Sequence, residues 1–393
     1  MNRYKRAFKE IYDFAGYIIC GILVLKEKAV VTLKRTKKTC NCPICKRRCS
    51  VIETYTRLIR DSNLSGKKCY IQLETCHIKC SCGYYGIEKL DFLDKYARFT
   101  KRFTDYVAVL CEKMSIKDVA EVMEIDWKTA KRIDKEALQK FVKDLKNVSP
   151  TQIGIDEIAY EKGHKYLTIV RDLAGRVIWI GEGRKKEVLD QFFKELGKEK
   201  CMKITFAVID MWDPYIASIK ENTNAEIVFD KFHVAKKINE VIDTIRKKEF
   251  AKAEPEERKL MKHKRFLILS RKKNLKPEEV EALDTLIQQN NTLYVAYLLK
   301  EQGLDVFDES NPISGIARLQ KWIENVVESG IEEFEKVLGT IKSYFYGIVN
   351  YFKYKLTNAA SEGFNTKITV IKRRAYGFRD LEYFKLKILQ SCG

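Results

Sequence analysis

The sequence lacks a hydrophobic run long enough to cross a membrane. The apolar stretch from Ile11 to Leu25 has 15 residues and is interrupted by Asp13, whereas a transmembrane helix needs about 20. Basic residues precede this stretch, but it ends without a clear small-residue cleavage site, so we do not expect a secretion signal. No internal repeat is visible. We therefore expect a cytoplasmic protein without a membrane partner.

Acidic residues are scarce relative to basic ones. The chain has 54 Asp and Glu against 74 Lys and Arg, a formal net charge of +20. Residues 1–60 hold 15 basic against 4 acidic residues, and residues 236–276 hold 15 against 6. A solubilising surface is one explanation, but such blocks favour a polyanionic partner such as nucleic acid. The 393 residues, 45% of them hydrophobic, are enough for two or three domains.

The cysteines are clustered. Eight of the twelve lie within 43 residues, and in a cytosolic chain such clusters indicate metal binding rather than disulfides. Cys42 and Cys45 form a CxxC pair, and Cys80 and Cys82 form a closer one. Together they supply the four sulfur ligands of a tetrahedral, structural zinc ion. We predict one zinc ion in a module spanning residues 1–90.

Other cysteines leave the zinc ligands open to alternatives. A CxC pair is less usual than CxxC, so Cys76 or His77 could replace one of its members. We interpret Cys40, Cys49 and Cys69 as the spare thiols. A set of reduced thiols packed as small hydrophobic groups is the alternative to a metal site.

Residues 91–150 have the pattern of short helices. An amphipathic segment spans Phe103 to Cys111, and Ser115 with Asp118 resembles a capping box. Asp126 is a second N-cap residue, ahead of a basic helix from Trp127 to Lys140. Two helices joined by a short turn, the second one basic, are typical of a helix-turn-helix that binds DNA. An ordinary helical hairpin is the alternative. The residues predicted to contact DNA are Lys128, Lys131 and Arg132.

After residue 150 the pattern changes to strands. We predict strands at 152–160, 165–171, 176–181, 203–210 and 225–230, with helices at 185–196 and 213–222. Three strands followed by helix, strand, helix and strand is the order of a ribonuclease-H-like fold. We assign residues 151–235 to the first part of a catalytic core, 236–350 to an all-helical insertion, and 351–393 to the last part. The fold class is therefore multidomain α/β.

Three carboxylates are candidates for the chemistry. Asp156 lies within the first strand of this core, Asp210 ends the fourth, and Glu362 begins the last helical segment. Both strands are too apolar for an unpaired charge, and in such a fold they are neighbours. Two-metal phosphoryl transfer needs carboxylates that converge on two ions roughly 3.5–4 Å apart. A single acidic residue, by contrast, is usually a solvated surface charge or a cap.

The motifs around these residues resemble those of insertion-sequence transposases of the ISL-three family, within the DDE superfamily. The resemblance spans essentially the whole chain, and the zinc module departs from it most. The segments that carry it are Cys42 to Cys45 with Cys80 and Cys82, Gly154 to Glu157, Ile209 to Tyr215, Phe229 to His233, Asn358 to Asn365, and Ile371 to Phe378.

The resemblance implies the roles of several residues. Asp156, Asp210 and Glu362 would be the catalytic triad and would hold two Mg²⁺ ions, for which Mn²⁺ can substitute. Asp230 and His233 belong to the second motif, either as groups that orient the site or as a helix cap and a core histidine. A run of cations after Glu362 suits phosphate contacts near the active site, against the alternative of an exposed basic face. These cations are Lys372, Arg373 and Arg374.

These observations lead to one interpretation of the whole chain. We expect a bacterial, nucleoid-associated DNA transposase that binds terminal inverted repeats and target DNA. The family implies a homo-oligomer on DNA, since two ends must be paired. A nuclease or Holliday-junction resolvase on the same fold is one alternative, but it needs no reader of terminal repeats. A non-catalytic DNA-binding regulator is another, and it leaves the three carboxylates unexplained.

Overall fold

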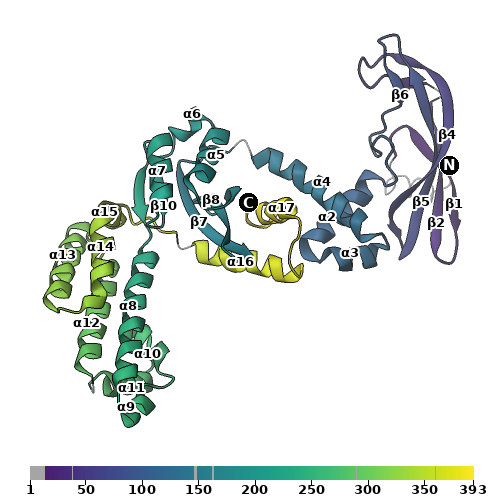
Figure 1. Ribbon diagram of the computed structural model, residues 1–393. Helices are drawn as coiled ribbons and strands as arrows, with labels where there is room; N and C mark the ends of the chain where they lie inside the picture. The colour runs from purple at the N-terminus through teal and green to yellow at the C-terminus, as the bar shows by residue number, and fades with distance from the viewer. Residues whose placement is uncertain (1–13, 38, 146–147, 162, 289, 359) are drawn as a thin grey trace. The chain divides into compact units, whose positions relative to one another are not determined.

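The chain forms two compact units (Figure 1). The first is Met1–Phe141 with Arg373–Arg379, and the second is Val142–Lys372 with Asp380–Gly393. The computed structural model describes residues 14–37, 39–145, 148–161, 163–288, 290–358 and 360–393. For residues 144, 145, 260 and 360–362 the description covers the backbone alone.

A six-stranded sheet begins the first unit, in the order β1-β2-β5-β4-β3, with β6 on the far end of β5. A long antiparallel hairpin of β4 and β5 dominates it, and β2 lies parallel to β5. The apolar run considered above as a signal or membrane segment contains β1. The strands are β1 (Tyr17–Val24), β2 (Lys28–Arg35), β3 (Cys40–Asn41), β4 (Arg48–Leu64), β5 (Lys67–Lys79) and β6 (Tyr85–Ile87).

Three helices follow this sheet: α2 (Lys101–Lys113), α3 (Ile116–Met123) and α4 (Trp127–Leu145). The Ser115 hydroxyl accepts from the Asp118 N–H at 3.2 Å, which confirms the predicted N-cap of α3. The Asp126 carboxylate accepts from the Lys128 N–H at 2.9 Å at the start of α4. Apolar side chains of the three helices form one small core, so the helices behave as one folded group.

The second unit is built on a five-stranded sheet in the order β11-β10-β7-β8-β9. β7, β8 and β9 are antiparallel neighbours, whereas β10 and β11 run parallel to β7. All five strands coincide with predicted ones to within a few residues. They are β7 (Gln152–Glu161), β8 (Lys165–Asp172), β9 (Val177–Glu182), β10 (Phe206–Ile209) and β11 (Glu226–Phe229).

Alternation along β7 gives the sheet two different faces. Ile153 and Ile155 are buried in the hydrophobic core that includes residues of α5 and α7. Gly154 and Asp156 point the other way, because successive strand residues alternate. This second face carries the polar contacts to the segment that leads into α16. The helices are α5 (Lys186–Leu196), α6 (Lys198–Cys201), α7 (Asp213–Asn222), α16 (Ala360–Arg374) and α17 (Leu381–Cys392).

Between β11 and α16 the chain forms a series of helices. Trp322 is fully buried in its core, with its indole N–H donating to the Leu299 carbonyl at 2.7 Å. The described residues of this helical segment contain no strand. The α-helices are α8 (Lys231–Lys252), α9 (Pro255–Met261), α10 (Arg265–Leu269), α11 (Pro277–Gln288), α12 (Asn291–Asp305), α13 (Pro312–Glu328), α14 (Glu335–Ser343) and α15 (Phe345–Tyr354).

Figure 1 shows that α8 extends away from the sheet and carries α9, α10 and α11 at its far end. Because α8 begins directly after β11 and Asp230, it connects the carboxyl edge of the sheet with the outer part of the insertion. Among the described residues, no helix combines the length and the apolar character needed to span a bilayer.

Candidate active site, cysteine cluster and DNA-binding helices

Three aspartates form a row across β7, β10 and β11: Asp156 lies in the middle of β7, whereas Asp210 and Asp230 directly follow β10 and β11. Val208 of β10 is in register with Gly154 of β7, so two residues further on Asp210 is level with Asp156. Ile209 is in register with Phe229 of β11, which makes Asp230 level with Asp210. Since side chains two residues apart point to the same face, Asp156 and Asp210 share the face of Gly154. The register thus brings two predicted catalytic residues together from distant parts of the sequence.

The outer two members of this row have different partners. Asp156 Oδ2 accepts from the Asn365 amide of α16 at 3.0 Å. Asp230 is buried and is the N-cap of α8, with Oδ1 accepting from the Phe232 N–H at 3.2 Å. Burial raises the pKa of Asp230, and the charge of Asp210 raises it further. Asp230 therefore caps α8, which is one of the two roles considered for it from the sequence, and it lies next to Asp210 in the row.

Asp210 is held by a histidine. His233 Nε2 lies 2.7 Å from Asp210 Oδ1. Burial raises the pKa of Asp210, the contact with His233 lowers it, and the charge of Asp156 raises it again. For His233, burial lowers the pKa, but the neighbouring Asp210 carboxylate outweighs burial and leaves the pKa above its usual value. His233 thus contacts one of the predicted catalytic carboxylates.

A buried cation that the sequence did not reveal lies close to the row. Arg171 of β8 is 2% exposed, and its Nη2 donates to the Asn358 carbonyl at 3.0 Å. Burial lowers the pKa of Arg171, whereas the charges of Asp156 and Asp230 raise it. Asn358 in turn donates from its amide to the Ile155 carbonyl at 3.4 Å. These two bonds hold the segment before α16 against β8 and β7.

Glu362 belongs to α16, but its side chain lies outside the described residues. Its backbone position is three residues before Asn365, which contacts Asp156. Positions three apart in a helix are neighbours on its surface. The helix that carries Glu362 is therefore the one that contacts the aspartate row.

The four predicted zinc ligands converge. The sulfurs of Cys42, Cys45, Cys80 and Cys82 all lie within 4.8 Å of one another. Cys42 and Cys82 are 3.5 Å apart, as are Cys45 and Cys80. Tetrahedral zinc with bonds of about 2.3 Å separates its sulfur ligands by about 3.8 Å. The N–H of Cys82 helps lower the pKa of Cys80 to about 6, whereas for Cys82 the Tyr84 N–H lowers the pKa and the neighbouring sulfurs, Cys42 first, raise it to about 11.

The alternative ligands lie elsewhere. Cys76 belongs to a second buried group with Cys40 and Glu88, but there the Arg35 guanidinium pairs with Glu88 and donates to Cys40. This group already contains its cation. His77 packs edge-on against Tyr85 at 4.5 Å. Of the spare cysteines, Cys69 is buried in another core, whereas Cys49 lies against the sulfurs of Cys80 and Cys42.

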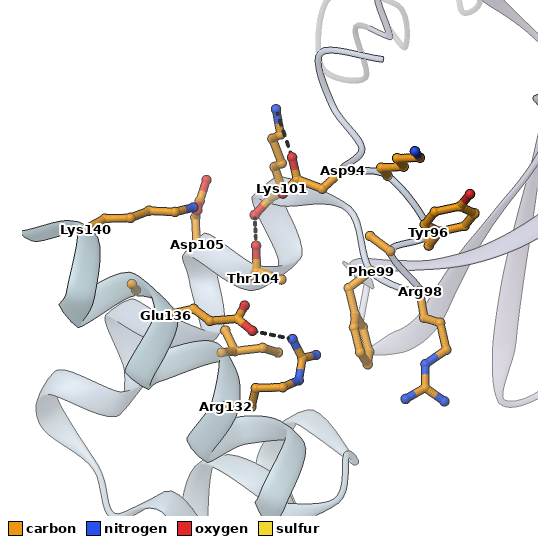
Figure 2. A pocket seen from close by; sticks show the side chains of 14 residues that line it. Asp94, Tyr96, Arg98, Phe99, Lys101, Thr104, Asp105, Arg132, Glu136 and Lys140 are labelled. Carbon is orange, nitrogen blue, oxygen red and sulfur yellow. Dashed lines mark hydrogen bonds and ion pairs between the residues drawn. The ribbon is translucent and has the colours of Figure 1, made fainter. Parts of the chain in front are cut away.

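The predicted DNA-contacting residues of α4 differ in their surroundings. Lys128 is exposed, with its ammonium 5.8 Å from the centre of the Trp127 ring. Lys131 is half-buried. Arg132 is exposed but pairs with Glu136 at 2.8 Å. Figure 2 shows this pair among the side chains that line a cavity between residues 94–105 and α4. The volume of this cavity is about 670 Å³. Because the lining contains both acidic and basic side chains, it is not a simple anion site.

The three predicted cations after Glu362 also differ. Lys372 donates to the Tyr160 carbonyl. Arg374 donates to the carbonyls of Glu112 and Lys113, at 3.1 and 3.0 Å, where α2 ends, as cations commonly do at a helix C-terminus. Arg373 is exposed. Two of the three therefore already have backbone partners.

Comparison with known proteins identifies the family. A family model described as "Transposase" matches residues 153–388. A second, described as "Helix-turn-helix domain of transposase family ISL3", matches residues 88–138. The chain belongs to transposase family ISL3. This confirms the resemblance inferred from the motifs.

Two curated relatives agree with this family. The chain is 34% identical over 365 residues to the transposase for insertion sequence element IS1001 of Bordetella parapertussis, covering 91% of this chain and 90% of the relative. It is 28% identical over 337 residues to the transposase for insertion sequence element IS1557 of Mycobacterium tuberculosis, covering 79% and 76%. The protein is thus a DNA transposase, with a helix-turn-helix that is consistent with DNA binding.

The site contains residues that the sequence interpretation passed over. Asn358 and Asn365 lay within a quoted motif, but they were not assigned a role until their contacts to β7 and Asp156 were visible. Arg171 gave no signal, because an arginine within a strand normally reads as a solvated residue. Only the three-dimensional register puts its charge close to the aspartates.

Proposed function

We propose that the transposase cuts and joins DNA with two Mg²⁺ ions held by Asp156, Asp210 and Glu362 on a ribonuclease-H-like core. The sheet order, three antiparallel strands followed by two parallel ones, supports that fold. The donor set fits a hard divalent cation, which prefers carboxylate oxygens. Like charges crowd together where burial and Asp156 raise the pKa of Asp210, and a cation relieves such crowding.

When bound, the ions would activate the attacking oxygen and stabilise the leaving one. The residues around the row set its geometry. His233 fixes Asp210, Asn365 fixes Asp156, and the Arg171 contact to Asn358 sets where α16 begins. Catalytic groups need such support, because a misplacement of about 1 Å can cost about 100-fold in rate.

We further propose five functional parts. Residues 1–90 hold one structural zinc ion on Cys42, Cys45, Cys80 and Cys82. Residues 91–150 bind the terminal repeats in a sequence-specific way. Residues 151–235 and 351–393 form the catalytic core around the insertion at 236–350. Pairing of two transposon ends requires more than one copy of the chain, so we expect a homo-oligomer on DNA. Target DNA would be engaged by the same assembly at the bacterial nucleoid.

The observation that carries this proposal is the level register of Asp156 and Asp210 on neighbouring parallel strands. The test uses a labelled duplex with the terminal repeat, scored in parallel for binding and for strand cutting. Asp156→Asn, Asp210→Asn and Glu362→Gln should each bind as the parent does, because affinity comes from basic residues that neutralise phosphates. Cutting should fall by several orders of magnitude.

A control variant shows whether the loss of cutting is specific to the carboxylates of the row. Glu182→Gln, at the end of β9, removes a carboxylate from the same sheet but outside the row, and it should leave cutting intact. Substantial Mg²⁺-dependent cutting by any of the three variants would exclude that residue from the metal site. Full activity in all three would overturn the proposal.

A further inference from the structure

Charge is segregated within the helical insertion. Residues 236–276, which include most of α8 and all of α9 and α10, hold 15 Lys and Arg against 6 Asp and Glu. Residues 277–356, from α11 through α15, hold 7 against 13. One half is therefore +9 and the other −6, although both contribute to one hydrophobic core. Solubility alone does not require such sorting, because interspersed charges keep a surface soluble as well.

Cations of the basic half follow α8 outward from the aspartate row. Lys236 is exposed near the start of α8, and its positive charge acts on Asp210. Lys247 lies eleven residues further along α8, and its side chain is 67% exposed. A helix rises about 1.5 Å per residue, so about 16 Å separates the two lysines.

Asp243 fastens the turn between α9 and α10 to this part of α8. Its carboxylate contacts Arg246 at 2.9 Å, Lys247 at 2.9 Å and Arg265 at 3.1 Å. One negative charge against three positive ones leaves an excess of two. Arg265 of α10 keeps 52% of its side chain exposed. The contact therefore fixes the position of the turn without neutralising it.

The turn itself, Lys262–Phe266, combines free cations with an exposed ring. Lys262 and Lys264 make no ion pair among the residues that the structure describes. The Phe266 residue is 76% exposed, although Ile268 on the same short helix is fully buried. His263 adopts a φ of 62°, in the left-handed region that residues other than glycine rarely occupy. We call Lys262–Phe266 the basic turn.

We propose that the basic half of the insertion binds duplex DNA, which runs along α8 from the aspartate row to the basic turn. This inference rests on the proposed function, because it takes the row as the place where DNA is cut. Lys262 and Lys264 contact phosphates, and Phe266 packs against the exposed sugar and base edges. Blocks of cations of this kind supply affinity that does not depend on sequence.

The length of α8 determines which base pairs of the duplex the basic turn contacts. Asp243 lies 13 residues beyond Asp230, which corresponds to about 20 Å along the helix. DNA rises about 3.4 Å per base pair. The basic turn should therefore meet the duplex about six base pairs from the scissile phosphate.

The first measurement is site-specific photocrosslinking with the full chain. Phe266 is replaced by p-benzoylphenylalanine, which keeps an aromatic ring, and Asp210→Asn is introduced so that the DNA stays uncut. The probe is a duplex with the terminal repeat and about twenty base pairs on either side of the cutting point, long enough to cover the distance derived above. We expect a crosslink about six base pairs from that point.

The second measurement is the salt dependence of binding to the same duplex. Lys262→Ala with Lys264→Ala should lower the slope of log affinity against log salt by about two, one for each lost phosphate contact. The matched control is Lys336→Ala with Lys342→Ala, which removes two exposed lysines of α14 in the acidic half. The control should keep the slope of the parent.

An unchanged slope in the Lys262 and Lys264 variant, without a crosslink from position 266, overturns the inference. A crosslink to an acidic protein in place of DNA overturns it as well. Melting temperatures equal to that of the parent show that the variants are folded. Cutting is scored separately: if Asp210→Asn still cuts, the proposed function fails, whereas a missing crosslink in a protein whose cutting depends on Asp210 rejects only the DNA path along α8.

Discussion

A β carbon at position 154 would stand 2.6 Å from the side-chain oxygen of Asn358. Gly154 lies two residues before Asp156 on β7, and Asn358 lies two residues before α16 begins. The absence of a side chain at Gly154 is therefore what lets the segment before α16 approach β7 at Gly154 and Ile155. This approach brings together parts of the chain that are about 200 residues apart.

Gly154→Ala should reduce cutting without weakening DNA binding. The new methyl group would displace Asn358 and with it the start of α16, because Arg171 Nε and Leu173 Cδ2, each only 3.2 Å from the added carbon, leave it little space. We expect a loss of about 10- to 100-fold in the rate of strand cutting. The control is Gly339→Ala on α14, where nothing lies within 4 Å of the added carbon. Equal cutting rates for the two variants would refute a positioning role.

Arg171→Met should destabilise the second unit. The variant leaves the Asn358 carbonyl without its donor and removes the buried cation beside Asp156 and Asp230. Removing one partner from a buried charged group costs about 3–5 kcal/mol. Arg171→Lys keeps the charge and should cost less. Thermal unfolding measures both, and identical melting temperatures for Arg171→Met and the parent would contradict this account.

Asp243 should make the stability of the insertion depend on pH. Burial raises the pKa of Asp243, but Lys247, Arg246 and Arg265 outweigh burial and lower it to about 2. The pKa in the unfolded chain is about 3.9. The stabilisation is therefore fully present above that value and is lost as the pH falls toward 2.

Asp243→Asn tests this dependence. At pH 7 the variant should melt below the parent, by roughly 2–4 °C for each kcal/mol lost. The difference between variant and parent should shrink below about pH 4. Glu240→Gln, an exposed neighbour on α8, is the matched control and should show no such trend. A constant difference down to pH 3 would exclude Asp243 as the titrating group.

The hydrophobic periodicity and the positions of turn residues were enough to predict most strands of the second unit. Ile153 and Ile155 alternate with Gly154 and Asp156, because one face of this part of β7 is buried and the other carries Asp156. Gly163 and Gly175 mark the turns on either side of β8. The first unit was harder to predict. Most residues between Arg48 and Leu58 of β4 are exposed, so this strand lacks the apolar alternation that identifies a half-buried one.

In the candidate site, only the residues that were both a carboxylate in an apolar strand and part of a family motif could be predicted from the sequence. Asp156 and Asp210 each stood out as a carboxylate in an apolar strand, and the strand order implied that they meet. Their supporting contacts were not visible in the same way, since the bond from Asn365 to Asp156 spans 209 residues. Nor could composition show that Arg132 pairs with Glu136 or that Arg374 meets α2.

The differing surroundings of the α4 cations predict unequal contributions to DNA binding. Lys128→Ala should weaken binding to the terminal repeat and lower the salt slope by about one. Arg132→Ala should have a smaller effect, because its guanidinium already pairs with Glu136. Lys143→Ala, in the last turn of α4, is the control. Equal affinities for Lys128→Ala and the parent at equal salt would make α4 a structural helix only.

The cysteine cluster predicts one zinc ion per chain. Cys42→Ser with Cys45→Ser removes two of the four converging sulfurs, so metal analysis of the purified variant should show no bound zinc. Such sites couple metal binding to folding, and the apparent binding energy is about 10–16 kcal/mol in small zinc modules. The sheet of the first unit should therefore melt at a lower temperature, and a strong chelator should lower the melting temperature of the parent in the same way.

Two further variants separate the ligands from their neighbours. Cys20→Ser changes an exposed thiol outside the cluster and should retain the zinc ion with unchanged stability. Cys49→Ser changes a thiol that lies against the sulfurs of Cys80 and Cys42 without belonging to the four, and it should also retain zinc. If the Cys49→Ser variant loses zinc, Cys49 is a ligand in place of one of the four assigned cysteines, since a structural zinc ion takes four ligands. Zinc retained by the Cys42 and Cys45 double variant would reject the site, because the two remaining sulfurs cannot complete a tetrahedron.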